Sequence, residues 1–170
     1  RYEDIYHVLR KTDLFRRGAG TSRPLLSDPE ALTTFKEGWP KRSVLGSNPP
    51  DHRRYRDMGD HFFSVIGAEK QTDLITRIVN DLIDNWIDDG EVEYVKSFAE
   101  PLPSMVITIM MGFPLEDLEN LKLWSEAWVA PFSLQLTAEE ERVAATRMVE
   151  FQHYIHDHIQ QRRKSPGDDV

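Results

Sequence analysis

Hydrophobic residues recur every three or four positions through most of this chain, a spacing typical of amphipathic helices. The clearest stripe runs through residues 74–87 and predicts a helix that stops at the Asp88-Asp89-Gly90 turn. A second stripe predicts a long helix after residue 137, with a core face of Ala144, Met148, Phe151, Ile155 and Ile159. The basic run 162–164 is expected to end that helix, because positive charge suits the negative end of the helix dipole.

The N-terminal part of the chain predicts less regular structure. Residues 2–10 carry apolar side chains at helical spacing and predict a short first helix. From Arg16 to Asn48 the spacing breaks down, because glycines and prolines interrupt it. One short helix is expected inside this stretch, with Asp28 as N-cap and Pro29 at the first helical position. A connection of this length inside a compact domain is usually functional or disordered.

Residues 91–112 predict a short strand followed by a buried helix. The strand is expected over 91–95. Ser97 and Glu100 have the spacing of a capping box ahead of the apolar run 105–111. That run is apolar on every side, so its helix is expected to be surrounded by other helices, and Gly112 is expected to end it.

Two further helices are expected in the C-terminal part, joined by an apolar linker. Pro114 starts the first of them, and residues 130–136 form the linker. Thr137 and Glu140 then form a second capping box at the start of the long helix. The predicted fold class is therefore mainly α.

Composition and charge exclude several functions. The 170 residues carry 21 Lys and Arg against 29 Asp and Glu, a net charge of −8, so no basic field would attract nucleic acid. No apolar run approaches the ~18 residues that a membrane-spanning helix needs. The absence of cysteine excludes disulfides, cysteine zinc sites, iron–sulfur clusters and a thiolate nucleophile in this segment, and the cytoplasm is the expected location. The chain begins without Met and stops where another helix would start, so we expect it to be a piece of a longer protein.

The predicted helix over residues 51–66, with Asp51 as its N-cap, carries the most informative chemistry. One narrow stripe of this helix, at intervals of four, three and four residues, holds His52, Arg56, Gly59 and Phe63. Two hydrogen-bond donors, a residue without a side chain and an aromatic ring suit a flat apolar ligand with carboxylates at one end. The pattern alone leaves open that the stripe is ordinary solvated surface.

Segment 48–56, with the sequence NPPDHRRYR, resembles the D-P-P-x-H-x-x-x-R segment of bacterial cytochrome P450 enzymes, the haem-thiolate monooxygenases. Other segments resemble parts of that family in the same order: 2–15 its B helix, 98–114 its E helix with the P-L-P…G-x-P signature, Trp124-Ser125 its F helix, and 162–169 its G-to-H junction. The resemblance covers nearly the whole chain. It implies that residues 1–170 form part of a P450 domain, a multi-helix orthogonal array that is incomplete at both ends.

The resemblance also implies roles for single residues. His52 and Arg56 would bind the propionates of haem (iron protoporphyrin IX), and Phe63 would contact the macrocycle. The connection 16–48 would cover the substrate pocket, and 130–136 would be the F–G loop above it. The pocket candidates are Val44, Leu45, Val129 and Phe132.

The implied partners are an apolar small-molecule substrate, O2 and an electron donor of the ferredoxin type, with neither nucleic acid nor a membrane. The donor would approach the exposed Arg53 and Arg54, although both are equally consistent with plain surface.

The family's iron-ligating cysteine, its threonine-bearing I helix and its E-x-x-R pair are absent from this sequence. The thiolate ligand is therefore expected beyond Val170, with no catalytic residue and no metal ligand in this segment. Two other interpretations stay open. A di-iron carboxylate protein would use the Glu150-x-x-His153 pair, of which the sequence has one copy. A non-catalytic helical interaction module would use the apolar 132–136 segment as a partner surface.

Overall fold

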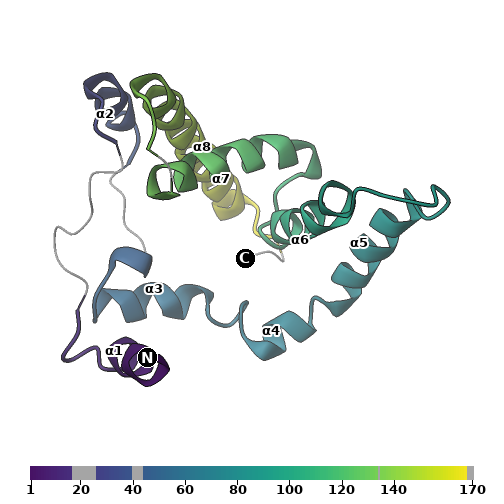
Figure 1. The fold of residues 1–170 in the computed structure, drawn as a ribbon, viewed down its shortest axis with the longest axis horizontal. Helices are drawn as coiled ribbons and strands as arrows, with labels where there is room; N and C mark the ends of the chain where they lie inside the picture. The colour runs from purple at the N-terminus through teal and green to yellow at the C-terminus, as the bar shows by residue number, and fades with distance from the viewer. Residues whose placement is uncertain (17–25, 40–43, 134, 168–170) are drawn as a thin grey trace.

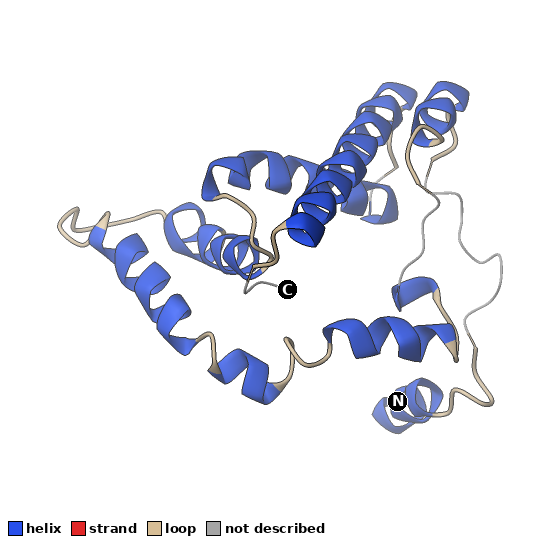
Figure 2. Ribbon diagram, turned by 180° about the vertical axis from the view of Figure 1, so that it is seen from behind, coloured by secondary structure: helices blue, strands red, loops and turns tan. Residues whose placement is uncertain are grey.

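In the computed structural model, residues 1–16, 26–39, 44–133 and 135–167 are described. Within these ranges the chain is helical and contains no strand, which confirms the mainly α class (Figure 2). The α-helices are α1 (Tyr2–Arg10), α2 (Pro29–Phe35), α3 (Asp51–Gly59), α4 (Val65–Glu69), α5 (Thr72–Asp84), α6 (Pro101–Met110), α7 (Leu118–Ser133) and α8 (Ala138–Lys164). Short 3-10 helices η1 (Val44–Gly46) and η3 (Leu115–Asp117) and the π-helix η2 (Val95–Ala99) complete the set. None of the helices in the described ranges is both long and apolar enough to cross a membrane.

The longest helix, α8, organises the packing. Both α2 and α7 pack against it, and α6 connects this group to α5 (Figure 1). The main core lies where α2, α7 and α8 meet, with Met148 fully buried between Ala127 and Ala144. Phe35 of α2 completes this core, with its ring edge-on to that of Trp128 at a centroid distance of 6.0 Å.

Charged residues of α8 hold the start of α2. Asp28 caps α2 as predicted, since its carboxylate accepts the N–H groups of the first helical turn. The buried Glu141 carboxylate accepts the backbone N–H groups of Ser27 (2.5 Å) and Asp28 (2.6 Å) and the Ser27 hydroxyl (2.7 Å). Arg142 donates from Nε to the Asp28 carboxylate at 3.1 Å. The N–H groups bound to Glu141 lower the pKa of that carboxyl despite its burial, and Arg142 lowers the pKa of Asp28.

The segment that follows α2 is held to α8 by an amide. The Gln152 Oε1 accepts the Trp39 backbone N–H at 2.6 Å, and its Nε2 donates to the Trp39 carbonyl at 3.3 Å. The Trp39 ring stacks on His156 and meets the edge of His153, with centroid distances of 4.8 and 5.2 Å. Gly38 has no side chain at the point where a Cβ would overlap the Gln152 amide, so glycine allows this close approach.

The predicted helix over 51–66 is wrong in its length and its cap. It divides into α3, which ends at Gly59, and α4, which starts at Val65. Ser64 adopts an extended backbone conformation and accepts the Gly67 N–H at 3.0 Å, so it starts a new helix as an N-cap. Asp51 is the first helical residue instead of the N-cap, a position taken by Pro50 after a cis peptide bond.

The predicted strand over 91–95 and the capping box at Ser97 are also wrong. The Glu93 carboxylate accepts the backbone N–H groups of Val95 (3.2 Å) and Lys96 (2.7 Å) and so starts a helical turn there. Ser97 lies inside the π-helix η2, and no side chain caps α6. The apolar run in α6 ends at Gly112 as predicted (φ +69°), but Ile107 is exposed.

The remaining helix ends agree in part with the prediction. The helix predicted over 74–87 ends earlier, at Asp84, and Gly90 takes a left-handed conformation (φ +78°) in the turns beyond it. The linker predicted over 130–136 is helical as far as Ser133, with Pro131 inside α7. The capping box of Thr137 and Glu140 is confirmed, with both reciprocal hydrogen bonds present.

Two glycines near the α3–α4 break predict opposite effects of alanine substitution. A Cβ at Gly67 would overlap the backbone carbonyl oxygens of His61 and Phe62, so we expect Gly67→Ala to lower the free energy of unfolding by about 1–3 kcal/mol. A Cβ at Gly59 would meet only the Phe63 ring, at 3.9 Å, and φ is not positive there. Gly59→Ala is therefore the control, expected to be neutral or stabilising by up to about 1 kcal/mol. Urea titration of the full-length protein without bound cofactor measures both, and equal losses in the two variants would contradict the proposed crowding at Gly67.

The Glu141 hydrogen bonds predict a loss of stability in acid. The folded state lowers the pKa of Glu141 below its ordinary value of 4.5, so its contribution is complete above that value. The contribution declines as the pH falls through 4.5 towards the lower pKa of the folded state, because the unfolded chain then binds the proton more readily. We expect Glu141→Gln to be less stable at pH 7 and to show a shallower decline in acid. Urea titrations at several pH values measure this, and parallel curves for the two proteins would refute it.

Candidate functional site

The predicted stripe of His52, Arg56, Gly59 and Phe63 is present, although its last member lies outside the helix. His52, half-buried, and Arg56 stand one turn apart on α3. The Phe63 N–H donates to the Gly59 carbonyl at 3.3 Å across the turn after α3. The Phe63 ring lies beside Gly59 yet is 61% exposed. The turn thus brings the ring to the same edge that an unbroken helix would have given.

The charges on α3 leave hydrogen-bond donors at this edge. Arg56 pairs with Asp60 through Nε at 2.8 Å, and within the described ranges no partner binds its terminal nitrogens. On another side of the helix Arg53 pairs with Asp57 at 2.7 Å. Ion pairing to Asp60 orients the Arg56 guanidinium while leaving donors for a second anion. An exposed ring beside a glycine, next to such donors, fits a flat apolar group that carries carboxylates.

Further large apolar side chains on α3 and α4 are exposed. Met58 is 63% exposed, and both Val65 and Ile66 of α4 are exposed as well. The sequence pattern does not single out these residues, because Met58 and Ile66 have the spacing of a core face. Large exposed apolar side chains on two consecutive helices are typical of a region where another group or another part of a protein binds.

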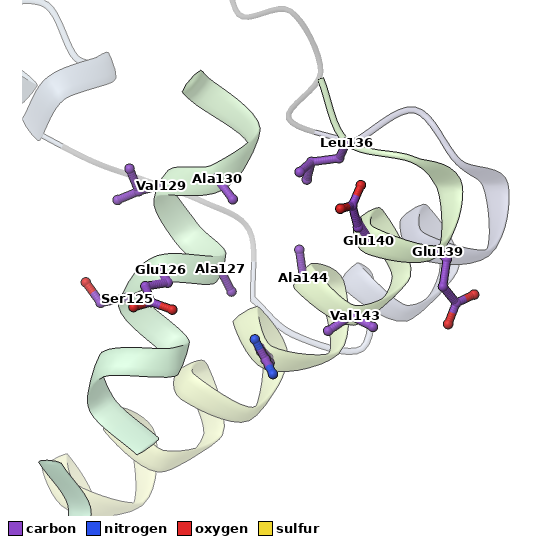
Figure 3. A pocket seen from close by; sticks show the side chains of 11 residues that line it. Ser125, Glu126, Ala127, Val129, Ala130, Leu136, Glu139, Glu140, Val143 and Ala144 are labelled. Carbon is purple, nitrogen blue, oxygen red and sulfur yellow. The ribbon is translucent and has the colours of Figure 1, made fainter. Parts of the chain in front are cut away.

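A groove of about 690 Å³ lies between the C-terminal half of α7 and the first turns of α8 (Figure 3). Its lining comprises Ser125, Glu126, Ala127, Val129, Ala130, Leu136, Glu139, Glu140, Val143, Ala144 and Arg147. Small apolar side chains from both helices form most of this lining, so the groove suits an apolar ligand. The sequence did not identify the α8 contribution, because the packing of α7 against α8 is a tertiary contact that no local pattern shows.

The four predicted pocket residues are not gathered at one place. Val129 lines the groove, whereas Phe132 does not line it and is 68% exposed. Val44 is half-buried in η1, away from the groove lining. Leu45 has its backbone in η1, but its side chain lies outside what the structure describes.

Of the four charged side chains that line the groove, Glu139 and Glu140 form an ion pair or hydrogen bonds within the described ranges. The Glu140 carboxylate is held by the capping box, and the hydrogen bonds from Thr137 lower its pKa. Glu139 lies 3.5 Å from the Arg142 guanidinium. Arg147 forms no ion pair within the described ranges and is half-buried. The groove therefore combines apolar walls with one cation available to a polar end of a ligand.

The residues suggested for a di-iron site do not assemble. The Glu150 carboxylate accepts the Trp124 Nε1–H at 3.1 Å, and His153 packs against Trp39. His158 lies against Phe113 and Tyr154 instead, in an aromatic cluster where burial and the hydrogen bond to Asp117 raise the pKa of Tyr154 to about 12. Within the part of the chain that the structure describes, no three His, Cys, Asp or Glu residues are close enough to hold a metal ion.

Known proteins similar to this chain are cytochrome P450s. A cytochrome P450 of Bacillus subtilis is 31% identical over 100% of this chain and 40% of its own length. Mycinamicin IV hydroxylase/epoxidase of Micromonospora griseorubida is also 31% identical, with the same coverage of both chains. No protein-family profile matches the chain.

Comparison of the fold with solved structures also leads to cytochrome P450s. The crystal structure of the myxobacterial cytochrome P450 CYP267B1 in complex with myristic acid superposes with a TM-score of 0.79 at 30% identity, over 99% of this chain and 41% of that one. This chain thus spans about two fifths of the length of the relatives it matches. Agreement in sequence and fold along the whole chain shows that it belongs to the cytochrome P450 family.

Proposed function

We propose that the whole protein is a haem-dependent monooxygenase that inserts one oxygen atom from O2 into an apolar small molecule. Membership of the P450 family carries this proposal. This chain would supply one edge of the haem site and part of the surface that faces the substrate. A non-catalytic helical interaction module is the alternative, favoured by the exposed apolar surface on α3 and α4.

The edge of α3 supports the haem assignment. His52 and Arg56 would donate to the two propionates, with Asp60 holding the Arg56 guanidinium in place. Phe63 would pack on the macrocycle, and Gly59 would let the ring plane approach the backbone. When bound with a thiolate ligand from outside this segment, haem supplies the oxygen chemistry. The contribution of α3 is to bind and orient the cofactor.

The apolar lining of the groove between α7 and α8 supports the proposal of an apolar substrate. Val129 and Phe132 on α7, together with Val44 and Leu45 in η1, would contact the substrate or line its path. The myristic acid in the CYP267B1 complex is an apolar chain with one carboxylate. A ligand of that general shape would place its chain along the groove and its polar end near Arg147.

The remaining proposals concern partner and location. Arg53 and Arg54 are exposed on α3 and would face an acidic electron donor of the ferredoxin type. We place the protein in the cytoplasm.

Haem binding tests the proposal directly. The full-length protein, expressed with hemin supplied, is expected to show a Soret band that shifts when the reduced protein binds carbon monoxide. A colourless full-length protein would overturn the haem assignment and favour the interaction module.

Removing both donors from α3 is expected to weaken haem retention. In full-length protein, His52→Ala with Arg56→Ala should lose haem about 10²- to 10⁴-fold faster, because the two charge-assisted hydrogen bonds contribute about 1.5–3 kcal/mol each. Transfer of haem to an excess of an apo-haem acceptor protein measures the rate. Arg53→Ala with Arg54→Ala is the matched control on the same helix, and an equal loss in that control would argue against propionate binding.

A smaller side chain in the wall of the groove is expected to weaken the binding of apolar ligands. Val129→Ala removes two methyl groups from its wall and should raise dissociation constants by up to about 15-fold, at ~0.8 kcal/mol for each carbon that the ligand buries. Spectral titration of the full-length haem protein with a panel of fatty acids and steroids measures this effect. Leu123→Ala, on α7 but outside the groove lining, is the control. Identical constants for wild type and Val129→Ala would remove the groove from the substrate path.

A further inference from the structure

The position of α2 depends on contacts outside itself. This helix has seven residues, and helices shorter than ~12 residues are marginal in water without tertiary contacts. Its described neighbours are α8, together with Trp128 of α7 against Phe35. What fixes α2 therefore lies chiefly on α8.

Two side chains of α8 hold the two ends of this segment. Glu141 uses both carboxylate oxygens before α2, on two backbone N–H groups and one hydroxyl. Gln152 uses both amide atoms after α2, on the N–H and the carbonyl of Trp39. Glu141 and Gln152 are eleven residues apart, about three helical turns or ~16 Å on one face of α8. Glu141 binds the segment at Ser27 and Asp28, and Gln152 binds it at Trp39, so the bound positions are also about eleven residues apart.

Between these two residues the helices meet closely, and apart from Phe35 the side chains in contact are short. Ala31 and Ala145 are both fully buried, so the two helices meet through short side chains. Short side chains allow close approach and bury little apolar area, hence they fix register weakly. The directional hydrogen bonds of Glu141 and Gln152 supply the missing register. Because Glu141 is only 8% exposed, its loss would leave backbone N–H groups without their partner in a buried place.

We infer that Glu141 and Gln152 are positioning residues that make α2 and α8 a single unit, so that a shift of α8 carries α2 with it. The pocket role of this unit rests on the proposed function, since the connection containing α2 would cover the substrate pocket, and the groove is formed by α7 and α8. Glu141 and Gln152 bind mainly backbone atoms, so the exposed side chains of α2 can vary while Ala31 and Phe35 stay in the core and the position of the helix is kept. Neither Glu141 nor Gln152 lines the groove, and neither belongs to the stripe of His52, Arg56, Gly59 and Phe63.

Hydrogen exchange in the full-length protein tests the unit itself. We expect Glu141→Gln to accelerate exchange of the amides in 27–39 by about 5- to 100-fold, matching 1–3 kcal/mol for a lost buried partner. Gln152→Ala removes exposed hydrogen bonds and is expected to accelerate exchange of the same amides by about 2- to 10-fold. The acceleration should reach the amides of α2 in both variants, while those of α3 stay unchanged. Asp157→Asn and Gln161→Ala, at exposed positions of α8, are the matched controls. Acceleration confined to the residues next to each substitution, or none, would overturn the inference.

Binding of two azoles to the haem iron tests the positioning role. Imidazole is small, whereas 4-phenylimidazole also needs space in the pocket, so the ratio of their dissociation constants reports on the pocket cover. Both variants should weaken the binding of 4-phenylimidazole several-fold and leave the binding of imidazole unchanged. General destabilisation of the protein would not produce this difference. Faster exchange with an unchanged ratio would overturn the positioning role. Failure of the proposed function would instead abolish every azole spectrum, and the exchange experiment would still decide whether α2 and α8 form one unit.

Discussion

Packing around the buried Met148 is the constraint on which the rest of this structure depends. Here α2 and α7 meet α8, and the small residues Ala127 and Ala144 let the helices approach closely. That approach aligns the C-terminal half of α7 with the start of α8 and so creates the groove. It also sets Glu141 and Gln152 opposite the two ends of the α2 segment. One apolar contact thereby places both the groove and the segment proposed to cover it.

Local signals in the sequence predicted the features that depend on neighbours within one helical turn. Asp28 and Thr137 cap their helices as expected, because a capping side chain and its N–H partners are at most three residues apart. The division between α3 and α4 was missed, since apolar spacing continues across it while Ser64 and the crowded Gly67 decide the break. At residues 91–95 the Glu93 carboxylate starts a helical turn in a stretch whose composition favours a strand.

In the candidate site, too, the sequence predicts what one helix determines and misses what long-range packing determines. His52, Arg56 and Gly59 share one face because a single helix carries them, and Phe63 returns to that face through a turn that periodicity does not describe. Arg147 and Val143 enter the groove from α8, which the sequence could not show to lie beside Val129. The hydrogen bonds that Ser27 and Asp28 donate to Glu141 join residues 113–114 positions apart, a separation at which no local pattern acts. Long-range pairs of this kind follow only from the packed fold.

The stacking of Trp39 on His156 has a spectroscopic consequence. Indole emission depends on the groups in contact with the ring, so it changes when a stacked imidazole moves away. Trp39 sits at the end of the α2 segment while His156 belongs to α8, so its fluorescence would report optically whether the two remain together. The other three tryptophans belong to the α5–η2 region and α7, and replacing them by phenylalanine would leave that signal alone in the spectrum.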